Sequence, residues 1–223
     1  MVQLGPGQAI YENLAEIAQA IDHVHRIELR ELLAQGEHSV EALAEACKLT
    51  FGNTSRHLQI LQWAQLVTAE RQGKHMLYSL AGPEVVVCLL KSLGCVGERN
   101  RAEVRQIMSD YFSARDALAP VTRDELVERL RDGRVTLLDV RPEHEFSLGH
   151  QPGALNIPLE ELETRLARLP KRWQIVAYCR GPYCVLLFEA VALLRAKGYR
   201  VRRLEDGFPQ WQAAGLEVET AEA

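Results

Sequence analysis

The sequence predicts a multidomain protein, with a mainly α-helical N-terminal half and a C-terminal α/β half built on a parallel central sheet. Three observations lead to this prediction. Apolar residues recur at helical spacing in the first half. Strand-like apolar runs alternate with helical segments after Val121. Leu118-Ala119-Pro120 has the composition of a linker between them. We therefore expect three parts, spanning residues 1–97, 98–120 and 121–223.

Composition narrows the class of protein. The 223 residues carry a formal charge of −4, with 47% hydrophobic and 25% charged residues, as in soluble globular proteins. This net negative charge argues against a protein that coats nucleic acid non-specifically. It is compatible with a DNA-binding surface that is basic only locally. No basic region followed by an apolar core opens the sequence, and its longest apolar run is too short for a bilayer, so we expect no membrane partner. Five irregularly spaced cysteines favour a cytoplasmic protein with reduced thiols.

Helices are expected over residues 8–21, 23–34, 40–47 and 51–63. Ser39 and Thr50 are good N-cap residues for the last two, and the short break between them fits a helix-turn-helix. Two strands then flank the basic segment 71–74, which predicts a hairpin.

Polar residues open the helix over 51–63 and apolar residues follow them, as in a helix that enters the major groove. The basic hairpin is suited to phosphates beside it. The alternative is a surface helical bundle with an incidental hairpin. The predicted DNA-binding residues are Asn53, Thr54, Ser55, Arg56, His57, Arg71 and Lys74.

This order of elements resembles the winged helix-turn-helix of ArsR-type bacterial repressors. The segments Glu31–Val40 and Ser55–Leu61 carry the resemblance, which covers roughly residues 8 to 95. It implies a homodimer that binds palindromic double-stranded operator DNA. Members of this family often sense metals through a Cys-x-Cys pair, but the corresponding stretch, His38–Leu43, contains no cysteine. We therefore expect no metal site, and no cofactor.

Two further helices are expected over residues 84–93 and 98–117, with the second completing a dimer interface. Cys88 and Cys95 are too far apart along a helix for an internal disulfide. The predicted sensing thiols are Cys47, Cys88 and Cys95. The resemblance places the helix of Cys88 and Cys95 at the dimer interface, which implies that these two could pair across subunits or with Cys47. The alternative for Cys47 and Cys88 is that they are small core residues.

Cys179 is the candidate nucleophile of the C-terminal half. It follows the apolar run 173–177 and precedes a helix expected over 185–196, with a Gly-Pro turn between them. Ligands of parallel α/β sheets bind at the carboxyl ends of strands. Unpaired amides and the helix dipole favour a thiolate there. The alternative is a buried strand-end thiol.

Several separated segments of this half resemble a single-domain rhodanese, over about residues 121 to 218. They are Leu138–Arg141, Gly149-His150, Gly153-Ala154, Asn156–Pro158, Cys179 and Gly207-Phe208 with Trp211. The resemblance implies that Cys179 takes sulfane sulfur from thiosulfate, polysulfide or a low-molecular-weight persulfide and forms a persulfide. Asp139, Arg141 and His150 are expected to hold the sheet and loops together.

The six-residue loop 179–184 has the rhodanese length. Neither Cys184 nor Val185 is the arginine that ends the longer loops of related phosphatases and arsenate reductases, which disfavours their chemistry. Arg180 is expected to attract an anionic donor, and backbone amides from Arg180 to Val185 to cradle the sulfur. Cys184 either attacks the persulfide or fills space at the helix start. The predicted catalytic residues are Cys179, Arg180 and Cys184, and the predicted substrate-binding loop residues are Gly181, Pro182, Tyr183 and Val185.

Together these features predict a transcriptional repressor in which sulfur status, read on Cys179, changes operator binding. One alternative is a sulfurtransferase that its helix-turn-helix half merely dimerises. The other is a thiol-based repressor that senses metalloids or redox changes without turnover.

Overall fold

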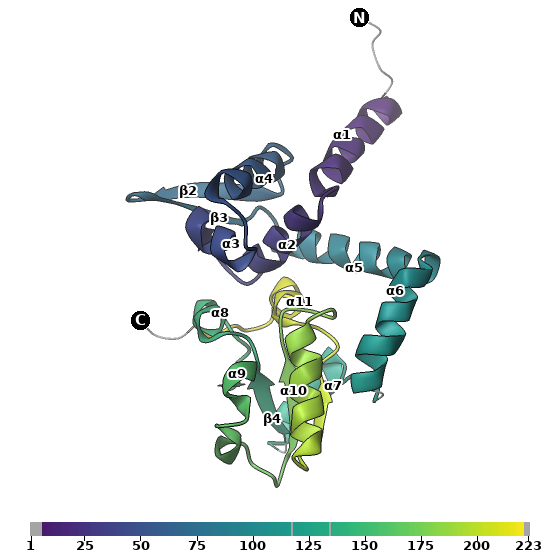
Figure 1. The fold of residues 1–223 in the computed structure, drawn as a ribbon, viewed down its shortest axis with the longest axis vertical. Helices are drawn as coiled ribbons and strands as arrows, with labels where there is room; N and C mark the ends of the chain where they lie inside the picture. Colours follow the sequence, from purple (N-terminus) through teal and green to yellow (C-terminus); the bar gives the residue numbers. More distant parts are fainter. Residues whose placement is uncertain (1–5, 117, 134, 221–223) are drawn as a thin grey trace, which may run out of the picture. The chain divides into compact units, whose positions relative to one another are not determined.

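The computed structural model describes residues 6–116, 118–133 and 135–220 (Figure 1). The chain divides into two compact units, Met1–Val86 and Val87–Ala223. Each unit is described separately below.

The first unit combines helices with a small antiparallel sheet. Its elements are α1 (Pro6–Ile21), α2 (Val24–Leu33), β1 (His38–Ser39), α3 (Val40–Ala46), α4 (Phe51–Trp63), β2 (Val67–Gln72) and β3 (His75–Leu80). The side chain of Ser39 accepts a hydrogen bond from the Ala42 amide, and that of Thr50 accepts one from the Asn53 amide. These bonds confirm the predicted N-caps, because each satisfies an amide that the first helical turn leaves unpaired. Leu29, Leu43 and Leu58 form the fully buried centre.

The predicted hairpin is the wing of this unit. Strands β2 and β3 pair from Val67–Leu80 to Gln72–His75, and Gly73 turns the chain at φ 60°. Arg71 lies within β2, not at the tip. The short strand β1 adds to β3, giving the order β1-β3-β2. The sequence did not predict β1, because two residues are too few to show an alternating pattern.

Helix α5 (Pro83–Asn100) corrects the prediction of two helices with a break between Leu93 and Glu98. The break lies instead at Arg101, which has extended backbone angles of φ −110° and ψ 115°. Helix α6 (Ala102–Ile107) and the π-helical segment η1 (Met108–Ser113) follow. Ala117, the predicted end of the second helix, lies outside the described residues.

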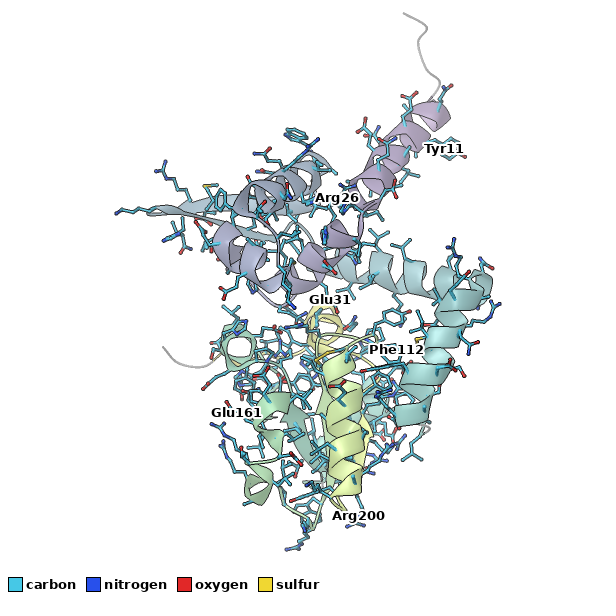
Figure 2. The ribbon with its side chains drawn as sticks, in the orientation of Figure 1. Tyr11, Arg26, Glu31, Phe112, Glu161 and Arg200 are labelled. Atoms are coloured by element: carbon cyan, nitrogen blue, oxygen red, sulfur yellow. A yellow bond between two sulfur atoms is a disulfide. The ribbon has the colours of Figure 1, made fainter. Side chains whose placement is uncertain are left out.

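The end of this helical segment packs on the C-terminal core. Figure 2 labels Phe112, whose ring meets that of Phe188 edge-on at a centroid distance of 4.7 Å. The buried Asp116 carboxylate lies 2.8 Å from Arg195 Nη1. Arg202 Nη2 donates to the carbonyls of Ala119 at 2.8 Å and Pro120 at 3.0 Å. The predicted linker is therefore held against the C-terminal fold.

The C-terminal fold is a four-stranded sheet with the order β5-β4-β6-β7, and all of its pairs are parallel, as predicted. Its elements are α7 (Arg123–Arg131), β4 (Val135–Asp139), α8 (Glu143–Leu148), β5 (Leu155–Asn156), α9 (Leu159–Leu162), η2 (Leu166–Arg168), β6 (Gln174–Tyr178), α10 (Val185–Ala196), β7 (Val201–Arg203) and α11 (Phe208–Ala213). Two buried clusters fill it, one around Phe188 and one around Trp211. Between β5 and β6 the chain forms only the short helices α9 and η2.

Candidate functional site

The loop from Cys179 to Cys184 connects the end of β6 to the start of α10. Cys179 is fully buried and Cys184 is 6% exposed. Their sulfur atoms form a disulfide, with the two Cα atoms 6.4 Å apart. The structure therefore brings together the two cysteines that the sequence predicted as reactive. Between them, Gly181 is buried and Pro182 is half-buried, while Val185 is an exposed first residue of α10.

Backbone contacts fix the shape of this loop. The Phe208 amide donates to the Cys179 carbonyl at 3.0 Å, and the Cys184 amide donates to the Gly181 carbonyl at 3.1 Å. One amide of the predicted sulfur cradle is therefore already used inside the loop. A Cβ atom at Gly207 would lie 2.5 Å from the backbone of Arg180 and Gly181, so only glycine fits there. The sequence analysis named Gly207 only as part of the Gly207-Phe208 segment that resembles a rhodanese, and it did not predict this close approach to the loop.

Arg180 makes an ion pair that the sequence analysis missed. Its Nε lies 3.0 Å from both carboxylate oxygens of Glu145, and its Nη2 also bonds to Oε1. Glu145 comes from α8 and is 1% exposed. The guanidinium that was expected to attract an anionic donor is thus engaged with a buried carboxylate.

Tyr183 extends from the loop to helix α5. Its hydroxyl donates a 2.8 Å hydrogen bond to the Glu98 carboxylate. Its ring lies directly over Gly94, where a Cβ atom would be 2.8 Å from the ring carbon that bears the hydroxyl. Burial raises the pKa of Tyr183, and the Glu98 hydrogen bond raises it further, as do the charges of Glu98 and Cys95. No local pattern in the sequence predicts the contact between Tyr183 and helix α5, because the two segments are far apart along the chain.

Asp139, Arg141 and His150 have the contacts of structural residues. Asp139 and Arg141 form a fully buried ion pair, and Arg141 Nη2 also donates to the Gly149 carbonyl at 2.8 Å. The His150 ring stacks on Phe146 at a centroid distance of 3.6 Å. These contacts tie the loops after β4 to the sheet.

The predicted DNA-binding residues differ in their exposure to solvent. Asn53 and Arg56 on α4 are exposed, as are Arg71 and Lys74 on the wing, and Ser55 is half-buried. Thr54 requires a correction, because its side chain is fully buried and its hydroxyl donates to the Thr50 carbonyl at 3.1 Å. It is therefore not available to DNA.

His57 faces other histidines. Its ring lies 4.5 Å from His23 and 5.9 Å from His25 between centroids, and Arg26 and Arg56 line the same cavity. Burial lowers the pKa of His57, and the neighbouring cationic groups lower it further. Within the described residues, no group of three or more His, Cys, Asp or Glu side chains is arranged to hold a metal ion.

The three remaining thiols are not paired with one another. Cys47 is half-buried in the first unit, while Cys88 and Cys95 are exposed on α5. The exposure of Cys88 is at odds with the alternative that it is a core residue. Among the described residues no helix is long and apolar enough to cross a membrane.

Comparison with known proteins covers both halves of the chain. The rhodanese-like domain family matches residues 122–214. The HTH-type transcriptional regulator Rv0324 of Mycobacterium tuberculosis is 42% identical over 212 residues, which are 95% of this chain and 92% of that protein.

Two further similarities each concern one half. A sulfurtransferase of Allochromatium vinosum is 33% identical over 100 residues, covering 44% of this chain and 92% of that protein. A solution structure of the homodimeric winged helix-turn-helix DNA-binding domain of Mb0332 from Mycobacterium bovis, a possible ArsR-family regulator, is 31% identical. It covers 46% of this chain and 94% of its own, with a TM-score of 0.41.

The similarity to Rv0324 extends over nearly the whole of both chains, so it is not confined to a single shared domain. The chain therefore belongs to the family of HTH-type transcriptional regulators that includes Rv0324, and it joins a winged helix-turn-helix half to a rhodanese-like domain.

Proposed function

We propose that this regulator is a homodimeric repressor whose rhodanese-like domain reads sulfane sulfur and thereby changes the affinity for operator DNA. Helix α4 enters the major groove through Asn53, Ser55 and Arg56, while Arg71 and Lys74 of the wing contact phosphates. The exposure of four of these five side chains supports this assignment.

The sulfur chemistry proceeds in two balanced steps. The Cys179 thiolate attacks the sulfane sulfur of the donor, and the bond between that sulfur and the donor's leaving group breaks, so that Cys179 becomes a persulfide. The Cys184 thiolate then attacks Sγ of Cys179, and the sulfane sulfur leaves as hydrosulfide. The product is the Cys179–Cys184 disulfide, and the donor is the oxidant. The pairing of these two sulfur atoms supports Cys184 as the resolving residue.

One observation carries the link to regulation. Tyr183 lies between the two reactive cysteines and hydrogen-bonds to Glu98 of α5, a helix that begins in the first compact unit and ends in the second. A change in the loop on disulfide formation therefore acts on a helix shared by the two units.

A gel-shift titration with DNA from upstream of the protein's own gene tests the proposal, before and after treatment of the reduced protein with polysulfide. We expect the treated protein to change its affinity, and Cys179→Ser to abolish the change. Cys88→Ser and Cys95→Ser are the controls, and both should retain it. A response that survives Cys179→Ser contradicts the proposal and assigns the signal to the thiols of α5 or to Cys47.

A redox-sensing repressor without sulfur transfer is the second candidate, because an oxidant such as peroxide produces the same disulfide. The near-complete burial of both cysteines admits only small reactants of either kind. Sulfide release distinguishes the two functions. Sulfur loading liberates one hydrosulfide for each disulfide formed, whereas peroxide liberates none.

A further inference from the structure

The loop from Cys179 to Cys184 has one cationic side chain, Arg180. Glu145 binds this guanidinium through both carboxylate oxygens, each 3.0 Å from Nε. The Glu145 side chain is 1% exposed, so water screens its charge very little. An approaching donor therefore meets a neutralised pair.

A second carboxylate contacts the same loop. Glu98 accepts the hydrogen bond of Tyr183 at 2.8 Å. The one guanidinium of the loop is therefore paired, and a further loop side chain is bound to another carboxylate. An exposed histidine, His144, also lies near Glu145, with Nε2 3.9 Å from Oε1.

These charges act differently on the donors that the proposed sulfur loading allows. Thiosulfate is a dianion, and its leaving group, sulfite, keeps two charges that must be desolvated or paired as the Cys179 thiolate attacks the outer sulfur. An organic persulfide carries at most one charge at its reacting end and leaves as a small thiolate or thiol. A loop whose one guanidinium is paired with a buried carboxylate discriminates against the first donor.

We infer that the sulfur donor is an organic persulfide and that Glu145 is the residue that excludes thiosulfate. This inference rests on the proposed loading of Cys179. A cellular thiol first reduces the disulfide, and the Cys179 thiolate then attacks the terminal sulfur of R–S–SH. The new S–S bond forms between Cys179 and the terminal sulfur as the S–S bond of the donor breaks, and R–S⁻ leaves with the electron pair.

The test uses the full-length chain carrying Cys184→Ser, so that the persulfide on Cys179 accumulates. Reduced protein is mixed with thiosulfate or with the persulfide of 2-mercaptoethanol, which has no other ionisable group. Loading is followed by mass spectrometry after rapid alkylation, with both donors at the same pH. Glu145→Gln is the test variant. Glu143→Gln is its matched control, because Glu143 is an exposed residue of the same helix.

We expect the parent protein to load from the persulfide at least about tenfold faster than from thiosulfate. Glu145→Gln should accelerate thiosulfate loading by about tenfold and change persulfide loading by less than about twofold, while Glu143→Gln changes neither. Adding Arg180→Met should remove the gain, because the released guanidinium is its source.

Other results overturn the inference. Equal loading of the parent protein from both donors does so without any variant, so the test survives a Glu145→Gln protein that fails to fold. A parallel change for both donors in Glu145→Gln assigns that residue a purely structural role. Loading from neither donor contradicts the proposed function itself.

Discussion

The phenol of Tyr183 donates a 2.8 Å hydrogen bond to the carboxylate of Glu98, a residue 85 positions earlier in the chain. It joins the loop that holds Cys179 and Cys184 to helix α5. A rhodanese-type loop and a regulator helix therefore share one polar contact, and the first three predictions concern it.

Replacing Glu98 by glutamine should weaken the response of DNA binding to sulfur. A typical coupling energy of about 1–3 kcal/mol corresponds to a ~5- to 150-fold change in operator affinity in the parent protein. We expect about a twofold change in Glu98→Gln, because a neutral amide holds the phenol less strongly than a carboxylate. Gel shifts compared at equal disulfide content measure the effect. Glu189→Gln weakens the matching bond from Tyr111 in the same way, and the response of this control should stay intact.

Gly94→Ala should uncouple the loop without unfolding the protein. The new methyl group would clash with the Tyr183 hydroxyl oxygen and lie 2.8 to 3.0 Å from two ring carbons, and this flexible side chain can rotate away. Alanine also favours the helix by about 0.5–1 kcal/mol, so the midpoint of thermal unfolding should not fall. Gly97→Ala is the control, because its nearest neighbours are the Val104 methyl groups at 3.8 Å. Loss of the sulfur response in both variants would contradict a specific role for Tyr183.

The same contact should be visible in the ionisation of Tyr183. Its pKa is raised above the usual value, first by burial and then by the hydrogen bond to Glu98. The folded state therefore favours the neutral phenol. This contribution to stability is complete below about pH 10 and is lost as the pH rises through the folded-state pKa. The tyrosinate absorbance of the parent protein minus that of Tyr183→Phe should show no ionised Tyr183 near pH ~11. In Glu98→Gln the phenol should ionise at lower pH; ionisation of Tyr183 at the ordinary value in the parent protein would contradict the contact.

Asp116→Asn should loosen the segment before the C-terminal fold. The carboxylate is fully buried, 2.8 Å from Arg195 Nη1 and 3.1 Å from Arg203 Nε. The contact with Arg203 is an ion pair without hydrogen-bond geometry, and the Leu118 amide donates a 3.0 Å hydrogen bond to Asp116 Oδ1. Both arginines are partly exposed, and we expect a loss of about 1–3 kcal/mol in the free energy of unfolding.

Chemical denaturation and limited proteolysis after residue 113 measure this change. Asp110→Asn is the matched control on the same segment, since its carboxylate accepts a hydrogen bond only from Gln106 among the contacts that the described residues show. If the Asp116→Asn protein were as stable and as resistant to proteolysis as the control, the proposed stabilising role of the Asp116 ion pairs would be contradicted.

Local signals in the sequence predicted the elements that they define. Helix α4 and helix α10 have the expected bounds, because a capping threonine marks the first and apolar periodicity marks the second. The two-cysteine loop was found in the same way, from a strand, a Gly-Pro turn and a helix in immediate succession. Contacts between distant positions were not predictable. Glu145 meets Arg180 across 35 positions, and only the folded sheet brings α8 to the loop.

Two errors have local physical causes. Thr54 was assigned to DNA because polar residues open α4, but its hydroxyl turns back to the Thr50 carbonyl and its methyl group is buried. The break at Arg101 lacks a glycine or proline, so no local signal predicted the separation of α5 from α6 there.

Phe112 belongs to the same buried cluster as Cys179 and Cys184, although it precedes the rhodanese-like sequence match by ten positions. Cutting the chain at Val121 would strip one wall from the interior that surrounds the reactive sulfurs. A fragment that is grafted onto a different regulator must therefore begin at α6. In this protein the segment that has to be moved as a unit starts upstream of the rhodanese-like sequence match.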